Sequence, residues 1–122
     1  MRRILSLTLT LLLLLAACAP AQPATSQAAL SADEVARAVL AACGEDPERL
    51  TTLEEQLGGG DVTAYLDDFY GLPAGSWDDC AVYLSPDPVS AFEVSVFRLT
   101  AQADTDAVLE GLEAYRLDRQ GA

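Results

Sequence analysis

Two cysteines are the residues with the clearest capacity for chemistry in the body of the chain. Cys43 and Cys80 can form a disulfide in an exported protein, because paired thiols oxidise outside the cytoplasm. Cys43 also falls on an apolar stripe and Cys80 opens a strand-forming run, so both can equally be small buried side chains. The sequence leaves a Cys43–Cys80 disulfide and two free thiols as alternatives. A thiol redox enzyme is disfavoured, since the chain has no CxxC motif.

Acidic residues are abundant, but their spacing matches no metal-binding motif. Adjacent pairs occur at Asp67-Asp68 and Asp78-Asp79, and neighbouring side chains on a helix or strand diverge rather than converge. Neither pair fits the spacing of a calcium loop, and two cysteines without any histidine cannot complete a zinc site. We therefore expect no metal ion or other cofactor, and interpret the acids as a solvated surface.

Catalytic residues are equally hard to identify. Serine chemistry lacks a histidine or lysine base. Two carboxylates can flank and hydrolyse a bond, but nothing selects one pair among 19 acids. Glu93 is the one acid inside a strand pattern, and its alternation with Phe92 and Val94 predicts that it faces water. The run Gly58-Gly59-Gly60 lacks the P-loop pattern, so we interpret it as a hinge.

The N-terminal segment carries a recognisable export signal. Arg2 and Arg3 precede a leucine-rich apolar stretch over residues 4–15, which as a helix is about 18 Å long and too short for a hydrocarbon core of about 30 Å. That length is typical of a signal peptide. The stretch ends in the sequence LAAC, which finishes at Cys18 and resembles the bacterial lipobox. In that motif the cysteine receives a diacylglyceryl group and becomes the new N-terminus.

The lipobox resemblance implies a lipid anchor and three regions of the chain. Stable attachment to a membrane needs two acyl chains, which a diacylglyceryl group on Cys18 supplies. We expect a signal peptide over residues 1–17, and a lipidated cysteine with an Ala/Pro/Ser-rich flexible tether over 18–30. A single small domain follows over 31–122. The expected location is the extracytoplasmic face of the cell membrane.

Helices are predicted in the first half of this domain. Ser31 and Glu34 form a capping box for a helix over 32–43, which Gly44 ends. Its expected buried stripe comprises Val35, Val39, Leu40 and Cys43, with Leu30 packed on Val35. Asp46 and Pro47 start a second helix over 47–57. Asp61 caps a third helix that ends at Gly71, with Val62, Tyr65, Leu66 and Phe69 facing inward.

The second half changes character. Residues 80–84 (CAVYL) and 91–99 (AFEVSVFRL) are rich in strand-forming side chains, and turn residues over 85–90 separate them. We therefore predict an antiparallel hairpin. A last helix over 104–119, capped by Asp104 or Thr105, presents Val108, Leu112 and Tyr115 as its apolar stripe. Helices, a hairpin and a closing helix indicate a small α+β domain.

The charge of the chain excludes one class of partner. The 122 residues contain 19 acidic residues against 7 arginines, for a net charge of −12. Two arginines lie in the leader, so the mature chain has 5 arginines against 19 acids, a charge of −14. Such a field repels the phosphates of nucleic acids. We expect no nucleic-acid partner, and interpret the acidity as a source of solubility.

Residues 50–115 resemble a family of uncharacterised bacterial lipoproteins common in Clostridia and related Firmicutes. The resemblance rests on Tyr70-Gly71, the segments AVYLS (81–85) and AFEVSVFR (91–98), and a helix that starts near Asp104. It implies an extracytoplasmic lipoprotein with an α+β domain, and it assigns no catalytic or binding residue. Family members continue into more strands after the last helix, so the resemblance implies a C-terminally truncated copy.

These observations favour a membrane-anchored lipoprotein that acts as a non-enzymatic interaction or binding module. A small carboxylate-dependent hydrolase is the alternative, and acids that converge in a concave pocket would favour it. With only two strands in the sequence pattern, we expect the helices to cover one face and bury Phe92, Val94, Val96 and Tyr115. An open hairpin edge invites pairing. We therefore expect a protein partner or self-association through that edge, or weak stability as a monomer.

Overall fold

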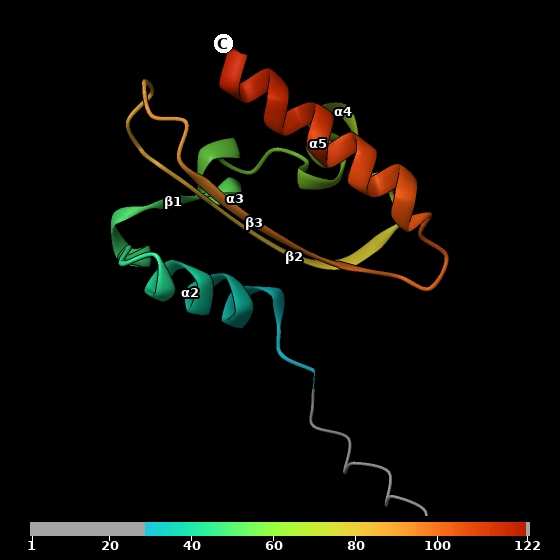
Figure 1. Cartoon of the computed structure of the whole chain (residues 1–122), viewed down its shortest axis with the longest axis horizontal. Coiled ribbons are helices and arrows are strands. Elements are labelled where there is room, and N and C mark those ends of the chain that lie inside the picture. The colour runs from blue at the N-terminus through green and yellow to red at the C-terminus, as the bar shows by residue number, and fades with distance from the viewer. Residues whose placement is uncertain (1–28, 122) are drawn as a thin grey trace, which may run out of the picture.

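The computed structural model of the chain describes residues 29–121 (Figure 1). Its elements, in chain order, are helix α2 (Ala32–Ala42), the 3-10 helix η2 (Pro47–Arg49), strand β1 (Thr51–Thr52), helices α3 (Leu53–Leu57) and α4 (Val62–Tyr70), strands β2 (Trp77–Leu84) and β3 (Glu93–Leu99), and helix α5 (Thr105–Gly121). The predicted signal peptide, Cys18 and nearly all of the predicted tether lie outside the described residues.

The sheet is antiparallel, with the strand order β1-β2-β3. Strands β2 and β3 form the predicted hairpin, and their register runs from Leu84↔Glu93 to Trp77↔Leu99 with a bulge between Trp77 and Asp79. Their bounds extend the predicted first strand by three residues at its start. Helices combined with this sheet confirm the small α+β fold.

The prediction of a two-stranded sheet beside a helix over 47–57 is wrong. Thr51 and Thr52 form β1, which pairs with Leu84 and Tyr83 of β2. The β-branched side chains of two adjacent threonines favour an extended backbone. The Thr52 side chain also caps α3 through a capping box with Glu55, so a new helix starts where the predicted one was to continue. The outer edge of β2 is therefore paired at its end.

Helices cover both faces of the sheet, and the prediction that they cover a single face is also wrong. In Figure 1, α2 lies on one side of the strands, and α3, α4 and α5 lie on the other. Val82 and Leu84 belong to the core shared with α3, α4 and α5, whereas Ala81 and Tyr83 belong to the core shared with α2. The apolar run of β2 supplies side chains to both faces, so each face needs a cover.

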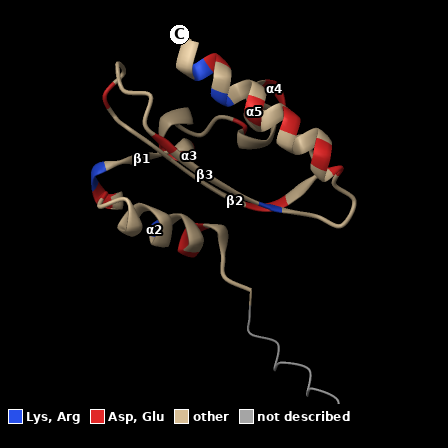
Figure 2. Cartoon of the chain, viewed as in Figure 1, with Lys and Arg blue, Asp and Glu red and all other residues tan. Residues whose placement is uncertain are grey.

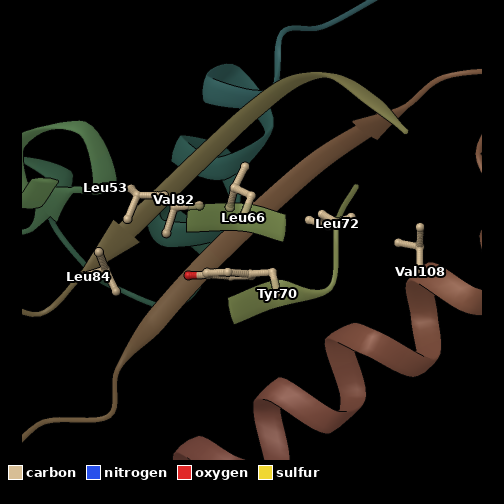
Figure 3. Packing of buried hydrophobic residues seen from close by; sticks show 7 residues of the cluster. All are labelled: Leu53, Leu66, Tyr70, Leu72, Val82, Leu84 and Val108. Carbon is tan, nitrogen blue, oxygen red and sulfur yellow. The ribbon is translucent and has the colours of Figure 1, made fainter. Parts of the chain in front are cut away.

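The larger core lies between the sheet and the three helices on the α5 side (Figure 3). Its buried members are Leu53, Leu66, Tyr70, Leu72, Val82, Leu84 and Val108. Tyr70 was not among the predicted inward residues of its helix, whereas Phe69 was, and Phe69 is 57% exposed. Leu66 is buried as predicted, so the difference is confined to the last turn of α4, where Tyr70 rather than Phe69 is directed toward β3.

The smaller core lies under α2. This helix begins with the predicted capping box between Ser31 and Glu34. The face it buries is Ala32, Ala36 and Leu40, of which only Leu40 belongs to the predicted stripe. Val39 and Cys43 are exposed, and Leu30 is 64% exposed, so the predicted contact between Leu30 and Val35 does not bury Leu30. Two alanines let the helix approach the sheet closely, where Phe92, Val94 and Val96 fill the space.

Acidic side chains are distributed over the helices, as Figure 2 shows. Positive charge is concentrated at few places, one of which is the C-terminal end of α5, where Arg116 and Arg119 lie. This end of α5 extends beside the start of β3 and forms one wall of the site described next.

Candidate functional site

A cleft of about 360 Å³ lies between β3 and α5. Its volume falls within the range of about 300–1,000 Å³ that is typical of small-ligand sites. The lining residues come from α4, β3, α5 and the segment just before β3: Tyr70, Ala91, Glu93, Ser95, Phe97, Leu112, Tyr115, Arg116, Arg119 and Gln120. The cleft therefore has an apolar and aromatic floor with polar groups at one end.

Local structure places each wall of the cleft. Alternation along β3 puts Glu93, Ser95 and Phe97 on the α5 side of the sheet. On the opposite wall, Gly111 allows α5 to approach the end of α4, because a Cβ atom at this position would lie 3.2 Å from the carbonyl oxygen of Tyr70. Without a side chain at position 111, α5 comes near enough for Tyr115 to reach Tyr70.

The carboxylate of Glu93 is the centre of the polar network in the cleft. The Tyr70 hydroxyl donates to Oε1 at 2.6 Å, and the Tyr115 hydroxyl donates to Oε2 at 2.7 Å. Ser95 donates a further hydrogen bond to Oε1. The Arg119 guanidinium lies 3.6 Å from Oε2, and the Glu93 side chain is only 11% exposed. A carboxylate offers about four acceptor positions, of which the three hydroxyls occupy three, and the Arg119 guanidinium supplies an opposite charge beside Oε2.

This arrangement contradicts the prediction that Glu93 faces water. The predicted alternation is confirmed, since Glu93 lies on the face opposite Phe92 and Val94. That face is covered rather than solvated, and the helices that cover it are distant in the sequence. A charged group this buried is retained only when hydrogen bonds and a counter-charge compensate its lost hydration.

Aromatic stacking holds the two tyrosines in place. The Tyr70 and Tyr115 rings stack with centroids 4.0 Å apart, and Tyr70 meets Phe97 edge-on at 5.7 Å. The Arg119 guanidinium lies 5.9 Å from the Tyr115 ring centroid, within reach of a cation–π contact. Three side chains from three different elements thereby fix the floor of the cleft.

Burial raises the pKa of both tyrosine hydroxyls. Burial raises the pKa of Tyr70 far above its usual value, and the neighbouring Glu93 carboxylate adds to this effect. Burial likewise raises the pKa of Tyr115 to about 12, with a further contribution from Glu93. Both phenols therefore remain neutral hydrogen-bond donors at physiological pH, and neither is suited to act as a base there.

The arrangement suits binding better than proton transfer. Among the described residues that line the cleft, Glu93 is the only carboxylate, so the cleft holds no second acid to flank a bond. The Glu93 carboxylate is engaged by three hydroxyls and the Arg119 guanidinium, and its side chain is only 11% exposed. The network instead fixes the aromatic side chains on the floor of the cleft.

Comparison of the chain with known proteins adds no identity to this geometry. No protein-family profile, characterised protein or solved structure matches it significantly. The resemblance to clostridial lipoproteins therefore stays a prediction. Within residues 29–121, no helix has both the length and the apolar character needed to cross a membrane.

The two cysteines for which the sequence left a disulfide or free thiols open lie outside the cleft. Cys43 is an exposed free thiol at the end of α2, and Cys80 is a half-buried free thiol in β2. The structure thus holds no disulfide between them. Burial raises the pKa of the Cys80 thiol, and the nearby Glu54 and Asp79 carboxylates raise it further. Cys18, the predicted lipidation site, lies outside the described residues.

The other sequence candidates have structural roles. Asp78 and Asp79 pair with Arg98 at 2.6 and 3.6 Å, and Asp79 accepts a hydrogen bond from the backbone of Ala32. Gly58 ends α3 in a left-handed conformation, as expected for a helix stop. Over residues 29–121, no group of three or more acids or cysteines is placed to hold a metal ion.

The residues that define the cleft were not predicted to lie together. Glu93 was considered but assigned to solvent, and Tyr115 was predicted only as part of an apolar stripe. One signal was available: Glu93, Ser95 and Phe97 share a face of β3, and a hydroxyl two residues from a carboxylate can bond it. The partners from α4 and α5 carry no comparable sequence signal, because the fold alone brings them together.

Proposed function

We propose that this protein is an exported, lipid-anchored binding module without enzymatic activity, and that its ligand site is the cleft between β3 and α5. The leader that ends at Cys18 supports the anchor and the extracytoplasmic location. The cleft supports binding. Its volume, its stacked aromatic floor and its fixed polar groups are the usual features of a site that is formed before the ligand arrives.

The observation that carries the proposal is the enclosure of the Glu93 carboxylate by its own side-chain partners. Three hydroxyls and one guanidinium surround its carboxylate, so the charge serves to fix Tyr70 and Tyr115. A buried network of this kind rigidifies a surface when every member has a partner. Rigid aromatic side chains give contact area at a low cost in conformational entropy, which favours recognition of a ligand.

A small carboxylate-dependent hydrolase is the alternative. It requires a carboxyl group that is free to exchange a proton with the substrate or a water molecule. Glu93 would first have to lose its internal partners. Assay of the protein and of a Glu93→Gln variant against esters, peptides and glycosides tests this alternative, and turnover that disappears in the variant would contradict the binding proposal.

Binding can be tested by filling the cleft. Leu112 lines it, whereas Leu109 lies on the same helix and is 59% exposed. We suggest titrating the isotope-labelled processed protein, in detergent, with a fragment mixture and a random peptide mixture while recording amide chemical shifts. We expect ligand-induced shift changes at the amides of Glu93, Ser95 and Leu112. Leu112→Trp should abolish these changes, and Leu109→Trp should leave them intact. Changes confined to other parts of the molecule, or none at all, would overturn the proposal.

A further inference from the structure

Strand β3 lies at one edge of the sheet. The order β1-β2-β3 leaves its outer side without a strand partner within residues 29–121, although β3 runs for seven residues from Glu93 to Leu99. An edge of this length presents a row of unpaired backbone N–H and C=O groups. These groups are available to an added strand.

The hydrogen-bonding pattern between β2 and β3 shows which residues direct their N–H and C=O groups to the open edge. The N–H of Ser85 donates to the carbonyl of Phe92 at 3.1 Å, so this opposing pair is a hydrogen-bonded one. In an antiparallel ladder such pairs alternate with non-bonded pairs. Val94 and Val96 therefore direct their backbone groups toward β2, and Glu93, Ser95 and Phe97 direct theirs outward.

The same three residues line the cleft with their side chains. An extended segment laid along β3 would thus hydrogen-bond to Glu93, Ser95 and Phe97, and every second side chain would stand on the cleft side of the sheet. Leu112 and Tyr115 of α5 form the facing wall. The edge strand and the helix therefore make the two sides of one groove.

Charge indicates what kind of segment fits. The two arginines that line the groove are already paired: Arg119 lies 3.6 Å from Glu93, and Arg116 lies 2.7 Å from Glu113. They therefore add little attraction for an anion. The protein as a whole carries a net charge of −12, and such a field attracts cations and repels a second copy of the same chain.

We propose that the groove takes a cationic, extended peptide segment of a partner protein, which adds to the sheet as a fourth strand beside β3. This inference rests on the proposed function, because it names the ligand class of the same cleft. Backbone hydrogen bonds give such a complex its affinity, and the side chains in the cleft give it specificity. Self-association through the hairpin edge is the competing outcome.

Amide hydrogen exchange tests the proposal directly. The probe is a synthetic peptide that alternates lysine and valine, mixed at low salt with the processed protein in detergent. We expect it to slow exchange at Glu93, Ser95 and Phe97 and to leave Val94 and Val96 unchanged, since the latter already bond to β2. A peptide with glutamate in place of lysine should bind at least about tenfold more weakly.

Two further peptides separate strand addition from other modes of binding. One carries backbone N-methyl groups on its lysines and the other on its valines. Only one of the two residue sets faces β3 in an added strand, so we expect one methylated peptide to lose binding and the other to retain it. Equal effects of both methylation patterns would overturn the proposal.

Failure of strand addition can be distinguished from failure of the proposed binding function. Chemical shift changes at Leu112 and Tyr115 without slowed exchange in β3 would mean that side chains alone hold the ligand. That result overturns strand addition and leaves the proposed function standing. If neither the peptides nor the fragments perturb the cleft, both proposals fail. A dimer gives a different result. Exchange at Glu93, Ser95 and Phe97 would then slow without peptide as the protein concentration rises, and sedimentation would detect the dimer. That result would assign the edge to a second copy.

Discussion

The Tyr115 hydroxyl lies 2.7 Å from Oε2 of Glu93 and joins the C-terminal half of α5 to the first residue of β3. Val108 is the only buried residue among the described positions of α5. Farther along the helix, Leu112 and Tyr115 pack partly buried against the core, and Tyr115 and Arg119 add polar contacts with Glu93. The polar network in the cleft thus helps to hold the wall of the cleft in place.

Removal of this carboxylate should destabilise the domain. Glu93→Ala leaves the buried Tyr70 hydroxyl without an acceptor, whereas Tyr115 can still donate to the Tyr70 oxygen at 3.2 Å. An orphaned buried group costs about 1–3 kcal/mol, so we expect a loss of at least about 1 kcal/mol in the free energy of unfolding, measured by urea denaturation. Glu110→Ala removes an exposed acid and should change it by less than about 0.5 kcal/mol. Equal effects would contradict the structural role of Glu93.

The raised pKa values of Tyr70 and Tyr115 predict that the domain loses stability at alkaline pH. The pKa of Tyr115 is raised from 10.0 to about 12 in the folded protein, and that of Tyr70 is raised in the same direction. The folded state therefore holds these protons more tightly than the unfolded state does. Their contribution to stability is complete below pH 10 and declines as the pH rises from 10 toward 12.

Thermal unfolding followed across this pH range checks the alkaline prediction. Tyr115→Phe removes one titrating group and should lessen the decline of the melting temperature with pH. Tyr65→Phe is the matched control, because Tyr65 is half-buried on α4 and does not line the cleft. An identical alkaline decline in the parent protein and Tyr115→Phe would show that Tyr115 does not contribute to it.

Replacement of Gly111 by alanine should destabilise the domain. An added Cβ would lie 3.2 Å from the carbonyl oxygen of Tyr70 and 3.4 Å from that of Gly71, so α5 must move away from α4. Alanine favours a helix by about 1 kcal/mol over glycine, but overpacking typically costs about 1–3 kcal/mol. We expect Gly111→Ala to lower the melting temperature. At Gly121 a Cβ meets nothing within 4 Å, and Gly121→Ala should be neutral or slightly stabilising.

The two thiols should differ in reactivity. The thiolate is the reactive form, and burial followed by the charges of Glu54 and Asp79 raises the pKa of Cys80. Cys43 is exposed. We expect a maleimide to label Cys43 rapidly in the native protein and Cys80 only on unfolding. Cys43→Ser and Cys80→Ser variants assign the two rates. Failure of both thiols to react after denaturation without reductant would reveal the disulfide that the sequence left open.

The anchor prediction is tested at Cys18. Cys18→Ala should release the protein from the membrane fraction or leave its leader uncleaved, because the alanine has no thiol to acylate. Fractionation and mass spectrometry of the N-terminal peptide measure both outcomes. Acylation and cleavage that persist before residue 18 in the variant would contradict the lipobox interpretation.

Local signals predicted much of the fold. The capping box at Ser31 and the stop at Gly71 mark helix ends through contacts within a few residues, and Asp104 caps α5 in the same way, accepting from the backbone of Ala107. The hairpin was equally accessible, because alternation and the turn between its strands are properties of neighbouring residues. Each of these features is determined by residues close together in the sequence.

The features that sequence reasoning missed depend on distant residues. Thr51 and Thr52 become a strand only because Tyr83 and Leu84 lie beside them. The exposure of Glu93 is decided by Tyr70 and Tyr115, which approach from separate helices. No periodicity within β3 carries that information, since a half-buried strand reads the same whether its polar face meets water or a buried network.

The attachment of α2 has a mechanical consequence. The backbone N–H of Ala32 donates to Asp79 at 2.8 Å, and the Tyr83 hydroxyl donates to Asp33. Both contacts lie in the first turn of the helix, where the chain enters from its N-terminal side. With the proposed anchor on this side of the domain, a force applied at the cleft would reach the anchor through this turn. The hydrogen bonds that Asp33 and Asp79 accept would then resist separation of α2 from the sheet.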